Sequence, residues 1–578
     1  MGNFKNILLF SIYFLFDISA LKAQGIQITN GAKLILNTSG SIVTNNHWIN
    51  NGQFVANGGN VYFTGIKMDI AGNNLSSFYN MNVLDGASTN IQTQGVQVQS
   101  KLKVDGTLNA NGNLTLLANK DLTALVDGSG IGNVNGTVFV QAYMANVFGY
   151  KYLGAPVQNA TIGQLASHVD LNASFPSVYS NNENSLSNGW VNYMQATNLM
   201  DPMRGYAFQF GNSNLPKRFT FNGLLNNGDM GINLQNSNNP YTKGFNLVSN
   251  PYPSLINWDA VGWNKNNIDN AIYYFDADTA DLYGGVYNTY INGISSDGKV
   301  NNIIPEFQSF FVHVTDGAYP VYGNLAFTNT IRVNYINTND RKINNNLIPS
   351  LGISAHFKAN TKSDFTIIYK DDNGSEKFDP NIDALKLMNT SEIVPSIYSI
   401  KSNRLLAINA ISSMDTSTIF PLGIHMPKEG MVVIDKNHDN LPLSFTNVYF
   451  IDKAMNKYID YNELNNYEVF LSKGNTEQRF FIQFSNKNIS NISKDAASLN
   501  HDALTVFVKQ EQLILSISKI ENKKASIQIT DMLGGILLNR DFTKIGMYEI
   551  NLPVVNGIYF VTYYSGNTKL TKKIFIGE

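Results

Sequence analysis

Short apolar pairs separated by turn dipeptides recur after position 24 and constrain the fold more than any other feature. Segments such as Ile26-Gln27-Ile28 and Leu34-Ile35-Leu36 carry apolar residues two positions apart, and turns such as Asn30-Gly31 stand between them. Short strands with such even punctuation are typical of a parallel β-helix, whose rungs stack their apolar residues inside. We therefore predict a β-solenoid over residues 25–140. Because the spacing is irregular, an ordinary β-sandwich is the alternative.

Residues 141–335 contain the same pattern twice. Segments 149–156 and 244–251 each begin with a glycine and an aromatic residue and reach a proline seven positions later. We expect two copies of one strand-loop-strand plan, packed as paired β units in one domain. Both copies carry long Asn-rich insertions, at about 170–200 and 262–300, and loops of this length on a rigid scaffold commonly hold binding sites.

Strand-like alternation continues to the carboxyl end. Segment 348–484 is predicted to form an antiparallel β-sandwich, and segments 336–347 and 485–500 have the composition of linkers. Residues 501–578 show four or more short strands with turns between them, which predicts a small β-sandwich of a size that can fold alone. The whole chain is therefore expected to be all-β.

Residues 1–24 resemble no part of a folded domain. A lysine at position 5, an apolar run from Ile7 to Phe16 and a small residue near Ala23 make up a secretory signal peptide, with cleavage after Ala23 or Gln24. Asp17 interrupts the apolar run, so no transmembrane anchor is expected, here or later in the chain. The signal predicts export through the Sec translocon.

Composition narrows the classes of function. Only 15% of the residues are charged, against ~25% in an average soluble domain. The formal net charge is -2, and no long basic run occurs, so nucleic acid is not an expected partner. The chain has no cysteine, which excludes disulfides, thiolate chemistry and cysteine-based metal sites.

Several motifs near the carboxyl end identify a family. They are the pair Asp531 and Gly534, the run Asn556-Gly557-Ile558-Tyr559, and the closing Lys572-Lys573. With these motifs the last seventh of the chain resembles the type A C-terminal sorting domain of cargo proteins of the type IX secretion system. The resemblance implies the type IX machinery as a partner and a secreted or outer-cell-surface location reached through the periplasm.

Catalytic motifs are missing from the sequence. The seven histidines are scattered singly, without the H-E-x-x-H spacing of a zinc site, and neither a phosphate-binding loop nor a dinucleotide fingerprint occurs. A polysaccharide-degrading β-helix would need a pair of carboxylates in one groove. The acidic residues of the predicted solenoid do not share one rung position: Asp69, Asp85, Asp105, Asp121 and Asp127. We therefore expect no enzyme.

One acidic loop suggests a cation. Asp276, Asp278 and Asp281 follow a strand-like segment, and alternate carboxylates on a turning chain can converge on calcium, which takes six to eight oxygen ligands. These residues form the hypothesis of a calcium site. A solvated acidic turn is the alternative.

Aromatic residues in the insertions suggest a contact surface. The candidates are Trp190, Trp258, Trp263, Tyr287 and Tyr290. Aromatic rings in loops suit stacking on sugar faces, although burial in the core is the alternative for each ring. We predict an exported binding or adhesion protein, with glycans or host and matrix surfaces as partners. A structural surface or matrix component and a secreted polysaccharide-degrading enzyme are the alternatives.

Overall fold

The computed structural model describes residues 25–92, 95–333, 348–414, 419–441, 448–484, 504–509, 512–517, 520–521, 523–544, 546–551, 557–566 and 568–576. These residues form β-strands and a few short 3-10 turns, without an α-helix, which confirms the all-β prediction. The predicted signal peptide 1–24, the predicted linkers 336–347 and 485–500, and Asn556 lie outside the described residues. In the described part, no helix has the length and apolar character to cross a membrane.

The chain divides into two compact units. The first comprises residues 1–413, 424–441 and 465–476, and the second comprises residues 414–423, 442–464 and 477–578.

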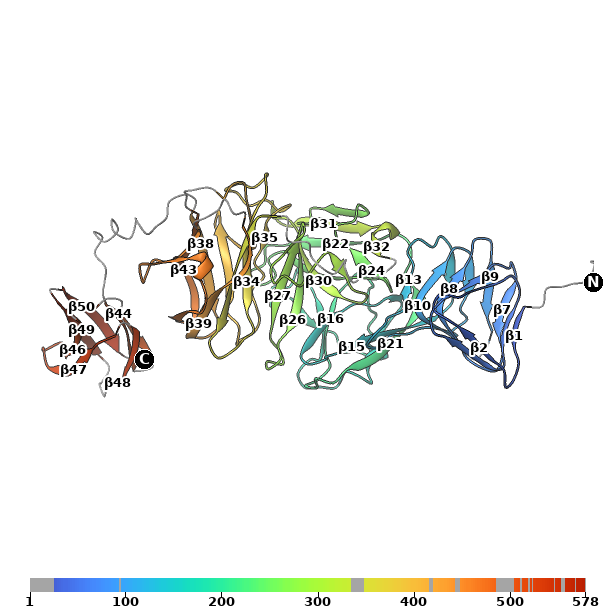
Figure 1. The fold of residues 1–578 in the computed structure, drawn as a ribbon, viewed down its shortest axis with the longest axis horizontal. Helices are drawn as coiled ribbons and strands as arrows, with labels where there is room; N and C mark the ends of the chain where they lie inside the picture. The colour runs from blue at the N-terminus through green and yellow to red at the C-terminus, as the bar shows by residue number, and fades with distance from the viewer. Residues whose placement is uncertain are drawn as a thin grey trace, which may run out of the picture. The chain divides into compact units, whose positions relative to one another are not determined.

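The first unit begins with a parallel β-solenoid, as predicted (Figure 1). One parallel sheet contains β1 (Ile26–Ile28), β4 (Trp48–Asn50), β7 (Met68–Ala71), β9 (Ser88–Ile91), β11 (Thr107–Asn109) and β14 (Asn133–Asn135). A second contains β3 (Ser41–Thr44), β6 (Asn60–Phe63), β8 (Ser76–Val83), β10 (Val96–Val104), β12 (Leu114–Leu116) and β15 (Val138–Met144), with β13 (Leu125–Val126) beside β10. The strands β2 (Lys33–Leu36) and β5 (Gln53–Ala56) form a short third side.

Each early rung takes 22 residues, since Ile26 pairs with Trp48 and Trp48 pairs with Ile70. Successive side chains of a strand point to opposite faces, so the apolar residues that alternate along each strand point into the solenoid. Trp48 is fully buried, with its ring centroid 4.8 Å from that of Phe54 and 5.1 Å from that of Phe78. Its indole nitrogen donates to Ser76 Oγ at 3.0 Å, so the polar end of the ring is also satisfied.

Two β units with the same strand order follow the solenoid. The first contains β16 (Tyr150–Leu153), β18 (Val178–Asn181), β19 (Trp190–Asn192) and β20 (Tyr206–Gln209), in the order β16-β20-β18-β19. The second contains β23 (Phe245–Ser249), β26 (Ile272–Ala277), β27 (Gly285–Ile291), β28 (Ile294–Ser295) and β30 (Ser309–His313), in the order β23-β30-β26-β27-β28. In both sheets the first strand therefore pairs with the last, and the second and third strands follow; the second sheet adds β28 at the end.

A flanking pair of antiparallel strands also recurs in each copy. β15 pairs antiparallel with β21 (Lys217–Leu225), and β22 (Met230–Asn236) pairs antiparallel with β31 (Val321–Phe327). β15 is at once the last strand of the solenoid sheet and the first strand of the first copy, so backbone hydrogen bonds join the two regions. The smaller elements here are β17 (Val157–Gln158), β24 (Leu255–Asn257), β25 (Trp263–Asn266), β29 (Ile303–Ile304), β32 (Arg332–Val333), η2 (Ile162–Leu165) and η3 (Asn329–Ile331).

A further sheet completes the first unit. Its strands are β33 (Ser350–Phe357), β34 (Asp364–Lys370), β35 (Ala384–Leu385), β36 (Ser396–Lys401), β37 (Arg404–Ile411), β39 (Gly430–Asn440) and β42 (Tyr467–Leu471), and β38 (Ile419–Met426) lies between β37 and β39 in the chain. β33 pairs antiparallel with β34 and β39, β36 with β37, and β39 with β42, whereas β34 and β37 run parallel with Ile367 beside Ile408. The prediction of an antiparallel β-sandwich over residues 348–484 was therefore wrong at this pair.

The second unit contains β40 (Val448–Asp452), β41 (Lys457–Asp460), η5 (Tyr461–Glu463) and the end of β43 (Gly474–Phe484), with β40 between β41 and β43. It also contains two sheets near the carboxyl end. The first is β44 (Leu504–Lys509), β45 (Gln512–Ile517) and β48 (Gly546–Asn551), and the second is β47 (Ile536–Phe542), β46 (Ala525–Asp531), β49 (Gly557–Ser565) and β50 (Thr568–Ile576). Residues from both sheets share one apolar core, which confirms the small C-terminal β-sandwich.

Candidate functional site at the junction of the two copies

Strand register makes residues of the two copies equivalent. A row crosses the first sheet through Tyr152, Ala207, Tyr179 and Asn192, and the matching row crosses the second sheet through Leu247, Phe311, Tyr273 and Thr289. Trp190 lies two residues before the end of the first row, and Tyr287 lies two residues before the end of the second. These two predicted aromatics therefore occupy the same place in their copies.

The two sheets share an aromatic core. The ring of Tyr152 stacks on Phe275 with centroids 4.5 Å apart and planes at 14°. The hydroxyl groups of Tyr152 and Tyr287 lie 3.2 Å apart, and the ring centroids of Trp190 and Phe311 are 6.2 Å apart. Side chains from both copies thus form one packed cluster, which fixes the loops at its edge relative to each other.

Two exposed rings lie at the edge of this core. Phe175 comes from the insertion of the first copy, before β18, and Tyr283 comes from the turn between β26 and β27 of the second copy. Their side chains are 54% and 53% exposed, and their ring centroids lie 5.0 Å apart at 69°. Tyr179 lies 6.4 Å from Phe175 and is half-buried. We call Phe175, Tyr179 and Tyr283 the junction patch.

Tyr150 packs against two rings of the junction patch, Tyr179 and Tyr283. It is buried, its ring centroid lies 6.3 Å from that of Tyr283 and 6.0 Å from that of Tyr179, and its hydroxyl donates to the carbonyl of Pro176 at 2.7 Å. Burial, followed by the neighbouring phenols of Tyr179 and Tyr283, raises the pKa of Tyr150 well above its ordinary value. The phenol therefore stays uncharged at physiological pH and holds the loop of Phe175 by its hydrogen bond.

The other predicted aromatics face the interior. Trp258, Tyr287 and Tyr290 are 0%, 5% and 2% exposed, so they contact protein rather than solvent. All seven residues of β27 are buried, because both faces of this strand are covered. Trp263 and Trp190 are half-buried, and the indole nitrogen of Trp263 donates to the carbonyl of Asn257 at 2.8 Å. Of the five predicted rings, Trp190 lies nearest the junction patch, 6.3 Å from Tyr179.

The sequence pattern did not predict Phe175 and Tyr283 as contact residues, because neither belongs to a strand-like aromatic run. Both lie beside turn residues, Phe175 before Pro176 and Tyr283 before Gly284-Gly285. An aromatic residue next to a proline or a glycine pair inside a long insertion was the available signal.

The structure does not bring the three predicted calcium ligands together. Asp276 Oδ2 lies 3.2 Å from Lys362 Nζ, whereas the buried Asp278 accepts a hydrogen bond from Ser391 Oγ. Asp281 Oδ1 accepts from the backbone nitrogen of Tyr283 at 3.0 Å and so shapes the turn that carries this ring. Across the described residues, no three His, Cys, Asp or Glu side chains gather as a metal site would require.

Four of the five solenoid carboxylates have their own separate protein partners. Asp69 belongs to a row of outward-facing side chains in which Asn135 donates to Asn109 at 2.9 Å, Asn109 donates to Asn90 at 2.6 Å, and Asn90 approaches Asp69 at 3.5 Å. Asp127 is buried and accepts from Ser129. The remaining members are Asp105, 3.2 Å from Lys103, Asp121, 3.2 Å from Lys120, and the exposed Asp85.

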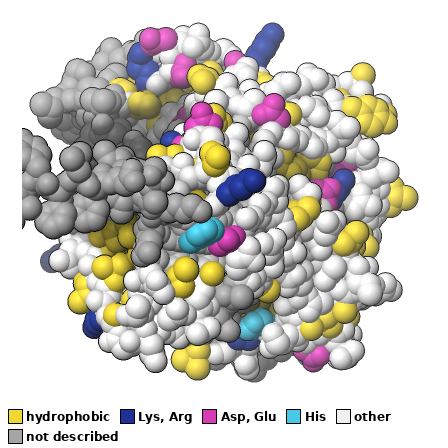
Figure 2. Space-filling model, turned by 90° about the vertical axis from the view of Figure 1, so that its right-hand side faces the viewer, with side chains coloured by type: hydrophobic (Ala, Val, Ile, Leu, Met, Phe, Trp, Pro, Cys, Tyr) yellow, Lys and Arg dark blue, Asp and Glu magenta, His cyan; other side chains and the backbone are white. Residues whose placement is uncertain are grey.

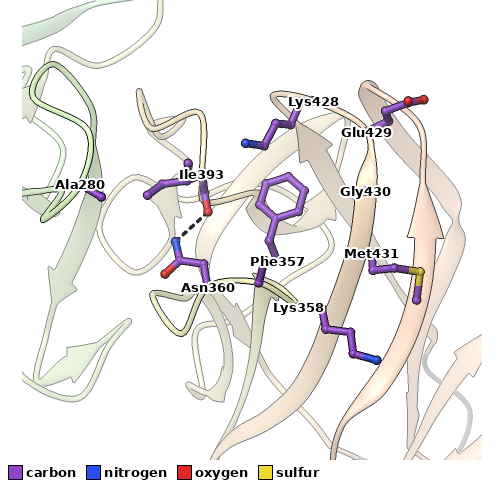
Figure 3. A pocket seen from close by; sticks show the side chains of 10 residues that line it. Ala280, Phe357, Lys358, Asn360, Ile393, Lys428, Glu429, Gly430 and Met431 are labelled. Atoms are coloured by element: carbon purple, nitrogen blue, oxygen red, sulfur yellow. Dashed lines mark hydrogen bonds between the residues drawn. The ribbon is translucent and has the colours of Figure 1, made fainter. Parts of the chain in front are cut away.

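A cavity of about 630 Å³ opens beside β33 and the start of β39 (Figure 3). Phe357 forms part of its wall, and Lys428 Nζ lies 5.5 Å from the centroid of this ring. The polar groups at the wall have protein partners: Asn360 Nδ2 donates to the carbonyl of Ile393 at 2.9 Å, and Lys358 pairs with Glu468 at 2.7 Å. We therefore regard the junction of the two copies as the stronger candidate.

The residues of the C-terminal motif stabilise turns and strands of the small sandwich. Asp531 Oδ1 accepts from the backbone nitrogens of Leu533 at 2.9 Å and Gly535 at 2.7 Å, which closes the turn after β46. Gly534 has a φ of 85°, a conformation that favours glycine. Tyr559 is buried in the core. In the last strand pair, Gly557 lies beside Ile576, and Lys572 and Lys573 lie beside Val561 and Phe560.

Comparison with protein families gives two matches. Residues 509–577 match the secretion system C-terminal sorting domain, which shows a cargo protein of the type IX secretion system and implies export to the cell surface or beyond. Residues 60–484 match a second family model, which covers more than half of the chain and includes the junction of the two copies. A comparison with curated proteins found no match. The chain therefore belongs to the family described as Domain of unknown function (DUF8693), and it carries a type IX sorting domain at its carboxyl end.

Proposed function

We propose that this type IX cargo protein is an adhesion or binding protein that recognises extracellular glycans through the junction patch. The observation that carries the proposal is the pair Phe175 and Tyr283, two half-exposed rings 5.0 Å apart that come from different copies. Exposed aromatic groups on a rigid support are a common mark of a binding surface.

The chemistry around the junction patch favours an uncharged ligand. Sugar rings present C–H faces that pack on aromatic faces, and such contacts need no charge. Asp276 of the second copy pairs with Lys362 at 3.2 Å, and the two opposite charges compensate each other. Figure 2 faces the right-hand end of Figure 1, where the solenoid lies, and the charged side chains on this face are few and scattered. Long-range electrostatic attraction of an ionic ligand therefore contributes little on this face.

The proposed route to the ligand has two steps. The predicted signal peptide at residues 1–24 directs the chain to the Sec translocon, and the C-terminal sorting domain then engages the type IX machinery. At the surface, the protein binds glycans or matrix surfaces without turnover.

Binding of the purified chain to a panel of immobilised glycans and matrix proteins tests the proposal. The variant Phe175→Ser/Tyr283→Ser removes both exposed rings of the junction patch. We expect it to lose about tenfold in affinity, since each ring contributes about 0.5–1.5 kcal/mol. Tyr322→Ser is the matched control, because Tyr322 is 67% exposed and lies outside the junction.

Reaction products are monitored in the same wells. Saturable binding that both variants retain equally would contradict the assignment to the junction patch. Release of soluble sugar would contradict binding without turnover and would direct the search to the solenoid carboxylates.

A further inference from the structure

A second cavity lies against the opposite face of the second copy's sheet, separate from the junction patch. Its volume is about 600 Å³, within the range of small-ligand sites. The residues that give it its chemistry are Tyr274, Asn288, Asp297, Lys299, Asn301 and Gln308. Alternation along β27 directs Tyr287 to the junction core and Asn288 to this cavity.

Asn288 places an amide in the cavity that the sheet itself does not require. The residue is 8% exposed as a whole, and it lines the open volume of the cavity. The equivalent position of the first copy is Val191, one residue before Asn192, as Asn288 is one residue before Thr289. The sheet therefore forms without an amide at this place. Because Asn288 lines the cavity, hydrogen-bonding groups that enter the cavity are available partners for its amide.

Two further side chains present acceptor oxygens. The backbone nitrogens of Lys299 and Val300 both donate to Asp297 Oδ1, at 2.9 and 3.0 Å, and Ser295 Oγ lies 3.1 Å from the same oxygen. All of these bonds use Oδ1, so Oδ2 is available to a ligand. Gln308 likewise uses its Nε2 group, which donates to the carbonyl of Ser309 at 2.7 Å, and its carbonyl oxygen is available.

The charges of the lining nearly cancel. Asp297 and Lys299 carry opposite charges, and Asp276 at the rim pairs with Lys362. An ionic ligand would lose its hydration on binding and would gain little electrostatic stabilisation from the lining. A hydroxyl group both donates and accepts, and so matches a mixed set of amide, carboxylate and ammonium groups. Tyr274 adds an aromatic surface, with its hydroxyl held by the carbonyl of Asn301 at 3.2 Å.

We propose that this cavity binds a neutral sugar residue. Asn288, Asp297, Lys299 and Gln308 bond its hydroxyl groups, and Tyr274 packs on its carbon face. The site is separate from the junction patch, since Asn288 and Tyr287 point to opposite faces of the sheet. An experiment can therefore refute one of the two sites without refuting the other.

The test uses the full exported chain and soluble neutral sugars: glucose, galactose, mannose, N-acetylglucosamine and their disaccharides. Saturation-transfer NMR detects binding, and calorimetric titration measures Kd. We expect saturable binding of at least one sugar at millimolar Kd or tighter. Asn288→Val, which installs the residue of the first copy, should weaken binding at least tenfold. Thr289→Val is the matched control, because this buried neighbour faces away from the cavity, and it should bind as the parent does.

Three results overturn the proposal. They are the absence of saturable binding for every sugar, unchanged Kd in Asn288→Val, and equal affinity for the matching uronic acids. If Asn288→Val lowers the melting temperature, Lys299→Ala decides instead, since Lys299 is exposed and its removal should weaken binding severalfold. Unchanged Kd in Lys299→Ala then refutes the site. The variant Phe175→Ser/Tyr283→Ser should bind these soluble sugars normally, which separates this test from that of the junction patch.

Discussion

The buried ion pair of Lys401 and Asp383 is expected to stabilise the sheet of β33 to β42, and the variant Lys401→Met tests its contribution to the free energy of unfolding. Lys401 Nζ lies 2.9 Å from both carboxylate oxygens of Asp383 and donates to the carbonyl of Ala410 at 2.6 Å. The two side chains are 5% and 0% exposed. Lys401→Met fills a similar space but leaves a buried carboxylate without its counter-charge. Breaking one side of a buried pair costs about 3–5 kcal/mol, which we expect at pH 7.

The loss should depend on pH. Burial, the largest cause, raises the pKa of Asp383, and Lys401 opposes this shift in the parent protein. Without Lys401, the pKa of Asp383 rises further. A raised pKa in the folded state adds stability that is full below the unfolded value of ~3.9 and is lost as pH rises through the folded value. The variant should therefore be less destabilised at pH 4 than at pH 7.

Scanning calorimetry of the full chain at the two pH values measures this effect, with the transition of the first unit followed in each scan. Lys377→Met is the matched control, because Lys377 is exposed in the same region and should change the melting temperature little. An equal loss of stability at pH 4 and pH 7 would refute the role of an unpaired carboxylate. A loss no larger than in the control would refute the importance of the pair.

The remaining predictions concern the solenoid, the acidic loop and the sorting domain. Trp48→Ala should destabilise the solenoid by about 3–5 kcal/mol, because a fully buried ring is removed, and thermal unfolding measures the loss. Asp278→Asn should lower the melting temperature equally in calcium and in chelator, since its bond partner is Ser391; a loss confined to calcium would instead support the cation site. Deletion of residues 504–578 should leave the protein in the periplasm, and surface display of the truncated chain, detected by protease accessibility, would contradict this. Asp531→Ala should lower the thermal stability of the C-terminal sandwich by about 1–2 kcal/mol, since two backbone nitrogens lose their acceptor.

Local patterns explain why the solenoid and the C-terminal sandwich could be predicted. Alternation of apolar residues within a strand depends only on neighbours in the chain, as in Ile26-Gln27-Ile28. The same holds for the turn at Asp531, whose hydrogen bonds reach only to Gly535. Parallel pairing of β34 with β37 could not be predicted in this way, because Ile367 and Ile408 meet across intervening strands.

Exposure of the aromatic rings also depends on distant contacts. Tyr287 and Phe175 both lie in or beside long insertions, and their sequences look equally suited to a surface. Tyr287 is buried because Tyr152 and Phe311, from other strands, cover it. Phe175 is exposed because its loop lies at the edge of that cluster, next to Tyr283. No spacing within the chain reports this difference.

The all-β class, the solenoid and the sorting domain follow from the sequence, because strand alternation, turn residues and terminal motifs are local properties. Contacts between distant parts of the chain select which rings form the junction patch and which amide enters the cavity. Both depend on how two copies, about a hundred residues apart, align their strands, since register selects the face on which each side chain lies.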